Sequence, residues 1–358
     1  MKTTQQSDKT RELLMSYCQA YPDVQIRDVF KFIYQSSFGC EHLVSSEKNV
    51  MDYIRAEADR GVADTMPYVE PLDGDYCRVS LHYINLGLSA DTLGRLFFLS
   101  SKKEPEGETE LKKKLEIAKA LVKENKLSFS VEDFEREISL WEADGYPSVH
   151  HSDAFREKYA PSYRVIQKRY IPFLPLFAEI DKRLSSGVLS VAVEGGSASG
   201  KTTLGEMLRE VYGCTVFHTD DFFLRPEQRT PERLTEVGGN LDRERLLEEV
   251  LVPLSKGETV SYRRFDCSGM AVLPPVSITP GKLTVTEGAY SMHPELRDYY
   301  DLSVFLDISP ELQKERILKR NTPQMAERFF NEWIPLENVY FHSEDIRNKC
   351  SMRIEITD

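Results

Sequence analysis

The chain has 358 residues, 41% of them hydrophobic and 29% charged, and a formal net charge of −12. This length is typical of two domains, and the balance of apolar and charged residues excludes a largely disordered chain. The net negative charge argues against non-specific binding of nucleic acid, because that binding depends on Lys and Arg side chains that displace counterions from phosphates.

The sequence shows no segment typical of a membrane or secreted protein. No run approaches the ~18 apolar residues that cross a bilayer, and the first residues lack the apolar core of a secretory signal. We therefore expect a cytoplasmic protein with no membrane partner. The six cysteines form no CxxC pair, so neither a zinc knuckle nor a disulfide framework is expected. The oligomeric state stays open, a homo-oligomer included.

Residues 1–185 are predicted to form a mostly helical domain. Apolar residues recur at three- and four-residue spacing in Glu110–Asn125 and Val131–Ala143, which is typical of amphipathic helices. Residues 101–109 are predicted as a loop and residues 74–80 as a short strand. We recognise no family of known function in this half.

Four of the seven histidines lie in this first half: His42, His82, His150 and His151. We interpret them as structural or surface residues. The alternative is a second functional site for a polar or phosphorylated ligand or for a metal, since histidine binds anions and metals and transfers protons near neutral pH.

A change of pattern marks the start of a second domain, residues 186–358. Leu184–Gly187 is a short breaker, and the apolar run Val188–Val193 follows at once. From there strand-like and helix-like segments alternate, which predicts an α/β domain whose mainly parallel sheet is flanked by helices. The predicted strands are Val188–Glu194, Thr215–Thr219, Leu283–Thr286, Ser303–Ile308 and Met352–Ile356, with helices from Lys201, near Arg243–Leu254 and from Pro310.

A glycine-rich segment after the first of these strands fits G-x-x-x-x-G-K-[ST], the phosphate-binding loop (P-loop) of nucleotide-binding proteins. Small residues let successive backbone N–H groups surround a phosphate, and the following helix adds its partial positive charge. The motif predicts ATP and Mg²⁺ as cofactors and leaves ATP or GTP as donor open. The predicted binding residues are Gly195, Gly196, Ser197, Ala198, Ser199, Gly200, Lys201, which reaches the β- and γ-phosphates, Thr202, whose hydroxyl ligates Mg²⁺, and Thr203.

Two further strands end in acidic residues. Asp220 and Asp221 follow one strand, and a carboxylate at this edge of the sheet is a candidate general base for an acceptor hydroxyl. Glu287 ends another strand, in the position from which a carboxylate holds Mg²⁺. The alternatives are a turn or helix cap for the acid pair and a plain strand end for Glu287.

A cluster of cations follows Pro310, with Arg316, Lys319 and Arg320 on a predicted helix and Arg328 beyond a proline-containing loop. Such a cluster is typical of a mobile lid that closes over a triphosphate and neutralises the transferring charge. The alternative is a solvated basic face.

The segment from about Val188 to Phe341 resembles the uridine kinase and phosphoribulokinase superfamily of P-loop kinases. The resemblance implies that Asp220 is the catalytic base, that Asp242 contacts acceptor hydroxyls and that Glu287 assists Mg²⁺. It also implies that Lys201, Arg316 and Arg320 take part in catalysis, and that Asp221 supports the fold or the metal shell. The motifs that carry it are GGSASGKTT (195–203), TDDFF (219–223), GGNLD (238–242), EGAYSMHPEL (287–296), YDLSVFLDI (300–308) and RILKRN (316–321).

The combined pattern predicts an ATP-dependent phosphotransferase whose acceptor is a small hydroxylated molecule, with a nucleoside favoured. The alternatives are another small alcohol, such as a sugar phosphate, pantothenate or glycerate, and an ATP-gated binding module without transfer activity. Uridine kinases usually present an aromatic residue and a histidine where this chain has Tyr262–Cys267. We expect Tyr262 or Phe265 to stack on a planar base, and Arg263 or Arg264 to bind the carbonyl oxygens of that base or an acidic group of the acceptor.

Overall fold

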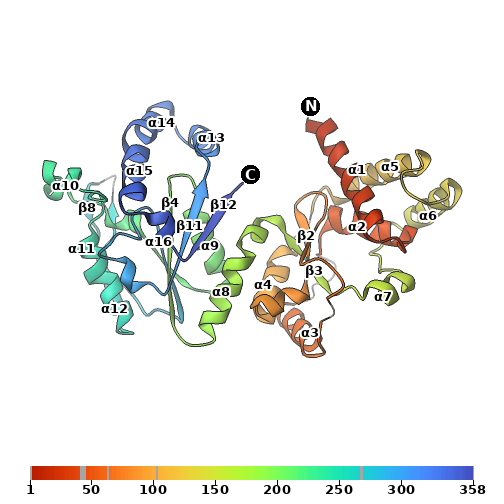
Figure 1. Cartoon of the computed structure of the whole chain (residues 1–358), viewed down its shortest axis with the longest axis horizontal. Helices are drawn as coiled ribbons and strands as arrows, with labels where there is room; N and C mark the ends of the chain where they lie inside the picture. Colours follow the sequence, from red (N-terminus) through yellow and green to blue (C-terminus); the bar gives the residue numbers. More distant parts are fainter. Residues whose placement is uncertain (1, 41–45, 63, 102–103, 267–268, 358) are drawn as a thin grey trace. The chain divides into compact units, whose positions relative to one another are not determined.

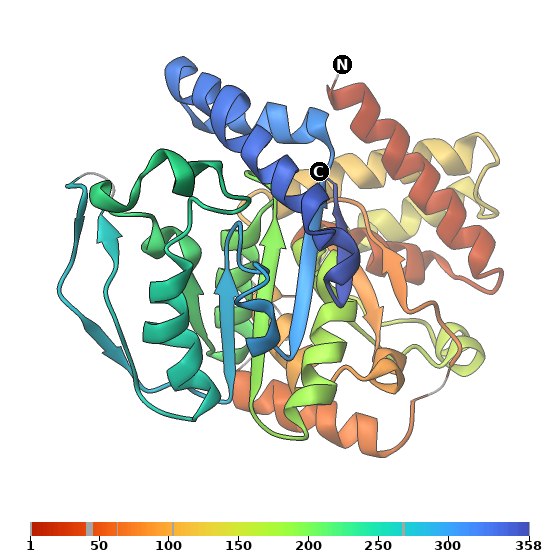
Figure 2. The same cartoon turned by 60° about the vertical axis from the view of Figure 1, so that its left-hand side comes forward.

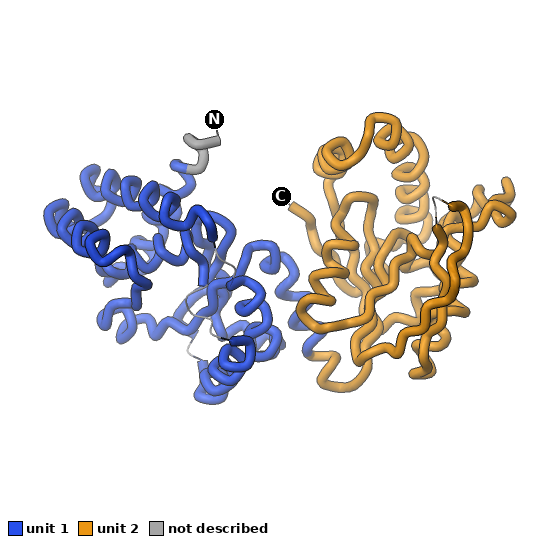
Figure 3. The backbone as a smooth tube through the Cα atoms, turned by 180° about the vertical axis from the view of Figure 1, so that it is seen from behind, with its two compact units in different colours: residues 1–181 blue, residues 182–358 orange. Residues whose placement is uncertain are grey.

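The computed structural model describes residues 2–40, 46–62, 64–101, 104–266 and 269–357. The chain divides into two compact units, residues 1–181 and 182–358 (Figure 3). The sequence places the boundary near residue 185, within a few residues of this division. Independent folding of residues 186–358 stays a prediction, which expression of that fragment tests.

Unit 1 is mainly helical. Four of its described α-helices begin with a serine cap, where the hydroxyl of Ser46, Ser89, Ser130 or Ser152 accepts a hydrogen bond from a backbone N–H of the first turn. The helical elements are α1 (Lys2–Ala20), α2 (Ile26–Phe38), α3 (Glu47–Asp59), η2 (Leu81–Leu86), α4 (Ala90–Ser100), α5 (Gly107–Lys123), α6 (Val131–Ala143), α7 (Asp153–Tyr159), η3 (Lys168–Phe173) and α8 (Leu174–Leu184), which reaches the start of unit 2 (Figure 1).

Unit 1 also contains a small antiparallel sheet in the order β1-β2-β3. Its middle strand β2 (Tyr76–Ser80) lies in the segment predicted as a strand, whereas β1 (Val69–Pro71) and β3 (Tyr163–Gln167) were not predicted. Both are short, and the pairing of β2 with β3 joins residues more than 80 positions apart, such as Arg78 and Val165. The loop predicted over residues 101–109 ends early, because α5 begins at Gly107.

Unit 2 is built on a five-stranded sheet in the order β12-β11-β4-β10-β5, and every neighbouring pair is parallel. Figure 2 shows these strands side by side with helices packed around them. The strands are β4 (Leu189–Gly195), β5 (Thr215–His218), β10 (Leu283–Glu287), β11 (Leu302–Ile308) and β12 (Met352–Ile356). The predicted α/β fold with a mainly parallel sheet is therefore confirmed, together with the mainly helical first half.

The connections of unit 2 carry helices and two short antiparallel ribbons. The ribbons pair β6 (Val260–Tyr262) with β9 (Val276–Ile278), and β7 (Phe265–Asp266) with β8 (Ala271–Val272). The helical elements are α9 (Lys201–Tyr212), η4 (Thr219–Phe222), η5 (Pro226–Gln228), α10 (Pro231–Thr235), α11 (Arg243–Leu246), η6 (Leu247–Leu251), α12 (Val252–Ser255), η7 (Arg297–Tyr299), α13 (Pro310–Arg320), α14 (Pro323–Arg328), η8 (Phe329–Trp333), α15 (Ile334–Ser343) and α16 (Ile346–Lys349).

The central strand β4 lies between β10 and β11. The connection after β4 leads to β5 on one side of it, whereas the connection after β10 crosses to β11 on the other side. In parallel α/β sheets, ligands bind outside the carboxyl ends of the strands at such a point. Among the helices that the structure describes, none has the length and apolar character needed to cross a membrane.

Candidate active site

The P-loop follows β4 directly and is shaped by three residues with positive φ: Gly195 (151°), Ala198 (62°) and Gly200 (99°). Glycine is required at the first position, because a Cβ on Gly195 would lie 2.6 Å from the carbonyl oxygen of Leu306. Helix α9 begins directly after the loop, at Lys201. The loop thus combines small residues and left-handed backbone turns with a helix N-terminus, the features that a phosphate-binding loop requires.

Lys201 and Ser199 show that this loop suits an anion. The ammonium of Lys201 donates to the carbonyl oxygens of Gly195 and Gly196, at 2.8 and 3.0 Å. The hydroxyl oxygen of Ser199 is buried and has no hydrogen-bond partner among the described residues. The ammonium of Lys201 and the unsatisfied hydroxyl of Ser199 are both donors that can bind the phosphates of a nucleotide.

The candidate metal site lies next to the loop. The hydroxyl of Thr202 donates to Oε1 of Glu287 at 3.0 Å, and Nδ1 of His218 lies 2.6 Å from the same oxygen. The register of β10 and β5 pairs Glu287 with His218, so the contact follows from the sheet. The hydroxyl and the carboxylate are both oxygen ligands of the kind that Mg²⁺ prefers.

His218 is a site residue that the sequence analysis missed. Its hydrogen bond with Glu287 raises the pKa of the imidazole above the ordinary value, against the effect of burial. The available signal was its position at the end of β5, two residues before Asp220. In the described part of the chain, no three His, Cys, Asp or Glu side chains form a group able to hold a metal ion.

Asp220 and Asp221 lie on η4, a single turn of 3₁₀ helix that directly follows β5. The side chain of Asp220 is exposed, yet the surrounding protein limits its hydration at longer range, and this desolvation raises the pKa of its carboxyl. The charge of Glu287 raises this pKa further, while Lys201 and His218 oppose the shift. Asp220 is therefore within electrostatic reach of the P-loop and the metal site.

Asp221 faces different partners. Desolvation raises the pKa of its carboxyl, and the charges of His218, Arg264 and Arg245 act in the opposite direction. Its backbone oxygen accepts a hydrogen bond of 2.9 Å from Nη2 of Arg245. The backbone of Asp221 thus contacts α11 through Arg245.

The lid arginines differ in their contacts. Nη1 of Arg316 lies 3.4 Å from the carbonyl oxygen of Ala198 in the P-loop. Arg320 is exposed, and its guanidinium lies 5.5 Å from the ring centre of Phe329, while that of Arg328 lies 4.9 Å from the ring of Trp333. The aromatic residues after the lid therefore hold two of its arginines beside η8.

A contact between α15 and the P-loop was not predicted. The backbone N–H and the hydroxyl of Ser197 donate to the two carboxylate oxygens of Glu337, at 2.8 and 2.6 Å. From α13, Nε2 of Gln313 donates to the carbonyl oxygen of Ser197 at 2.8 Å. The helices on both sides of α14 thus hold the same residue of the loop. The sequence signal was weak, a single acid among the mainly apolar residues of α15.

We expect Glu337→Ala to weaken the binding of Mg²⁺-ATP by about tenfold, or about 1.4 kcal/mol, because it removes two hydrogen bonds that hold the loop in shape and part of their stabilisation is lost from ATP binding. Glu337→Gln, which keeps an oxygen acceptor for the N–H of Ser197, should lose less. Isothermal titration calorimetry with a non-hydrolysable ATP analogue measures both, with the exposed Glu332→Gln as the matched control. Wild-type affinity in Glu337→Ala would exclude a positioning role.

A second carboxyl, Glu194, is fully buried at the end of β4. It accepts hydrogen bonds from the N–H of Gly195 at 2.9 Å, the N–H of Met292 at 3.1 Å and the hydroxyl of Tyr340 at 3.1 Å. Burial raises the pKa of Glu194 from 4.5 to about 7. Tyr340 lies one turn after Glu337, so α15 contacts both the start of the P-loop and the strand before it.

This raised pKa predicts a pH dependence of stability. Folded Glu194 keeps its proton to a higher pH than unfolded Glu194, so the stability of unit 2 should fall as the pH rises from about 4.5 to about 7. Between pH 5 and pH 8 the wild type should lose roughly 2–3 kcal/mol more than Glu194→Gln, which cannot titrate. Calorimetric unfolding of the full chain at both pH values measures the difference. Equal losses in the two proteins would show that this carboxyl does not titrate with folding.

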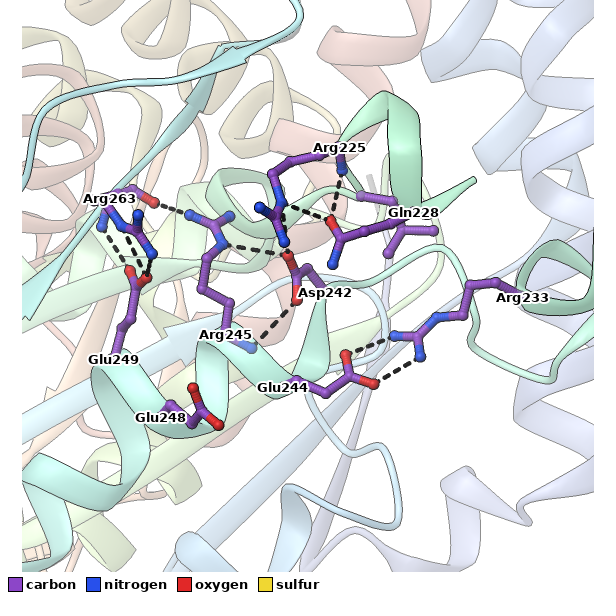
Figure 4. Close-up of a pocket in the computed structure, with 10 residues that line it drawn as sticks. Arg225, Gln228, Arg233, Asp242, Glu244, Arg245, Glu248, Glu249 and Arg263 are labelled. Atoms are coloured by element: carbon purple, nitrogen blue, oxygen red, sulfur yellow. Dashed lines mark hydrogen bonds and ion pairs between the residues drawn. The ribbon is translucent and has the colours of Figure 1, made fainter. Parts of the chain in front are cut away.

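The predicted acceptor residues do not all come together. Asp242 caps α11, where its Oδ1 accepts from the N–H of Arg245, and lines a cavity of about 380 Å³ (Figure 4). Tyr262 does not line this cavity, because its ring packs in the core between Phe217 and Phe222, with ring centres 5.5 and 5.8 Å away. The structure therefore places this ring in the core and not on a base.

Arg264 also lies outside the lining of this cavity, and its side chain is exposed. Its charge lowers the pKa of Asp221. Cys267, at the end of the segment predicted to read a base, lies outside the described residues.

The N-terminal histidines occupy separate places in unit 1. His151 is buried, with Nδ1 2.9 Å from Asp28 and Nε2 2.7 Å from the hydroxyl of Tyr163, and burial lowers its pKa to about 4. His82 lies 3.5 Å from Asp64, and His150 is exposed. His42 lies outside the described residues. His151 is thus a neutral core residue with both ring nitrogens satisfied.

Comparison with known proteins agrees with the motifs of unit 2. Uridine kinase-like protein 3 of Arabidopsis thaliana is 28% identical over 142 residues, which is 37% of this chain and 30% of that protein. A uridine kinase of Chlamydia pneumoniae is 27% identical over 150 residues, 39% of this chain and 66% of that protein. The chain therefore spans less than two thirds of either curated relative.

The solved structure of a possible uridine kinase from Bacillus stearothermophilus aligns with 47% of this chain and 89% of that chain, at 21% identity and a TM-score of 0.38. The family described as "Phosphoribulokinase / Uridine kinase family" matches residues 190–329. The resemblance predicted from the motifs is confirmed: the C-terminal half of this chain carries a phosphoribulokinase/uridine kinase family segment.

Proposed function

We propose that unit 2 transfers the γ-phosphoryl group of ATP to a hydroxyl of a small molecule, with Mg²⁺ as the metal cofactor. The observation that carries this proposal is the meeting of Lys201, the Thr202–Glu287 pair and Asp220 at the carboxyl ends of three adjacent strands. An anion-binding loop, a metal-binding pair and a carboxylate base are the parts that phosphoryl transfer to an alcohol requires.

Each residue has a chemical task in this reaction. The P-loop and Lys201 bind and orient the phosphates, and Thr202 and Glu287 hold the metal ion. Asp220 accepts the proton of the acceptor hydroxyl. The acceptor oxygen then forms a bond to the γ-phosphorus. At the same time the bond between the γ-phosphorus and the β,γ-bridging oxygen breaks, and ADP leaves. Mg²⁺ neutralises charge on the phosphate oxygens.

The raised pKa of Asp220 suits a base. A carboxylate is a weak base at its ordinary pKa, and desolvation brings it closer to the working pH, where it accepts a proton more readily. Closure of the lid over Asp220 would remove more water and add to this shift. Arg316 and Arg320 then supply positive charge to the transferring group.

Taken alone, the sequence motifs favour a nucleoside as the acceptor, in line with the names of the curated relatives. The alternative acceptors are a sugar phosphate, pantothenate and glycerate. The alternative function is an ATP-gated binding module without transfer activity. A cytoplasmic location, the absence of a nucleic-acid partner and the oligomeric state stay predictions.

The test is formation of ADP from Mg²⁺-ATP by the full chain, with and without each candidate acceptor. An acceptor-dependent rate well above the background supports a kinase. ATP binding with no increase from any acceptor would favour the binding module.

A further inference from the structure

A cavity of about 380 Å³ opens beside the turn that carries Asp220 (Figure 4). Two backbone contacts join its wall to this turn: the N–H of Asp242 donates to the carbonyl oxygen of Phe222 at 2.7 Å, and Nη2 of Arg245 donates to that of Asp221 at 2.9 Å. An acceptor held in this cavity would therefore lie beside the turn that carries the proposed base. The cavity is lined by Leu224, Arg225, Gln228, Arg233, Asp242, Glu244, Arg245, Glu248, Glu249 and Arg263.

Nine of the ten residues that line this cavity are polar or charged. Leu224 is the one apolar residue among the ten, and no aromatic side chain is among them. Tyr262 and Phe265, which the sequence offers for stacking, are only 6% and 5% exposed. A planar base gains most of its binding from an aromatic or apolar surface on its face. The described lining offers no aromatic face for such stacking.

The arginines of the cavity already have acidic partners. Arg233 donates to both carboxylate oxygens of Glu244, at 2.7 and 2.8 Å, and Nε of Arg263 donates to Glu249 at 3.0 Å (Figure 4). The lining holds four arginines and four acids, so their formal charges balance. A phosphorylated acceptor would bring negative charge into a site whose cations are already neutralised, which is unfavourable.

Asp242 and Arg245 leave one acceptor atom and one donor atom unsatisfied. Asp242 is 2% exposed and Arg245 6% exposed, and neither Oδ2 of the carboxylate nor Nε of the guanidinium forms a hydrogen bond with the described residues. The two atoms lie 3.4 Å apart, and Nε of Arg225 lies 4.0 Å from the same Oδ2. A hydroxyl group donates one hydrogen bond and accepts others, so it can satisfy both atoms at once.

We propose that the acceptor is a neutral, non-aromatic polyol, a sugar or sugar-like molecule, whose hydroxyls bind Asp242, Arg245 and Arg225. This inference rests on the proposed phosphoryl transfer and narrows its acceptor. A nucleoside would bind through its ribose alone, so the identity of its base would not matter.

The test compares kcat/KM of the full chain for three groups of acceptors with Mg²⁺-ATP. The neutral polyols to be tested are ribose, ribitol, fructose and myo-inositol. The nucleosides are uridine, cytidine and adenosine, and the anionic acceptors are ribose 5-phosphate, glycerate and pantothenate. We expect a neutral polyol to be the best acceptor, the nucleosides to agree within about threefold, and the anionic acceptors to be at least tenfold poorer.

Asp242→Asn tests the contact itself. Asparagine keeps the oxygen that caps α11 but replaces one acceptor oxygen with a donor, so kcat/KM for the polyol should fall at least thirtyfold while the affinity for ATP is unchanged. The exposed Glu232→Gln on α10 is the control. Thermal unfolding shows whether the variant is folded.

Two results would overturn the proposal: a preference above tenfold for one base among the nucleosides, or turnover of an anionic acceptor only. If no acceptor is turned over although ATP binds, the proposed transfer fails. Saturation-transfer NMR with an ATP analogue present then measures the binding of ribose and myo-inositol to the wild type and to Asp242→Asn. This measurement tests whether the cavity binds a polyol, independently of phosphoryl transfer. Absence of binding to the wild type, or equal binding to both proteins, would overturn the polyol assignment.

Discussion

Lys201→Ala is expected to lower the rate of phosphoryl transfer by about 10²–10³-fold, the range found when one pre-organised donor to a developing charge is removed. The ammonium now donates to the carbonyl oxygens of Gly195 and Gly196, at 2.8 and 3.0 Å, and is not part of the core. Its loss should therefore leave the fold intact. The comparison is kcat with the best acceptor, at equal unfolding temperature of the two proteins.

The exposed Lys256→Ala is the matched control for loss of one positive charge. Both proteins carry the same net charge, so a general electrostatic effect on the binding of ATP would appear in both. A Lys201→Ala protein with near-wild-type kcat would remove the P-loop lysine from the mechanism.

Asp220→Asn is expected to lower kcat by about 10²–10⁴-fold, because asparagine cannot accept the proton of the acceptor hydroxyl. ATP binding should be close to that of the wild type, since the phosphates contact the loop and not this side chain. The structure supports the choice of Asp220 over Asp221: the former is in the field of Lys201 and Glu287, whereas the backbone oxygen of the latter binds Arg245.

Asp221→Asn is the internal comparison for this prediction and should be clearly milder. Its side chain keeps the same shape, and its neighbour Asp220 keeps its charge. Single-turnover rates separate the chemical step from release of product. Should Asp221→Asn reduce the chemical step more than Asp220→Asn, the two roles must be exchanged.

Much of the candidate active site could be predicted from the sequence because its parts are local. The conformation of the P-loop depends on glycines within the loop itself, such as Gly195 and Gly200, whose φ angles are positive. The positions of Asp220 and Glu287 follow from strands that are buried and apolar, since parallel strands bring their carboxyl ends to one edge. The order of the motifs was enough to identify the family segment.

The details of acceptor recognition could not be predicted in the same way. The sequence predicts Tyr262 as a stacking residue because it is aromatic and lies in the segment where uridine kinases bind a base. In the structure its ring is buried in the hydrophobic core. Burial of an aromatic ring stabilises a core strongly, and one sequence does not say which face of a short ribbon points inward. The sequence analysis also missed two strands of the sheet in unit 1. The strand β1 is close to its partner β2 in the chain, but β3 is distant from it, and no local pattern specifies either pairing.

The amino-acid sequence by itself determined the nucleotide-binding loop, the alternation of strands and helices in unit 2 and the acids at the strand ends, because short-range backbone geometry and hydrophobic patterning control these features. Only the tertiary structure decided which distant groups complete the site. Ser197 and Glu337 are 140 residues apart, and Glu194 and Tyr340 are 146 residues apart. Their contacts depend on how α15 packs over the sheet, and no local pattern specifies a hydrogen bond between buried groups so far apart.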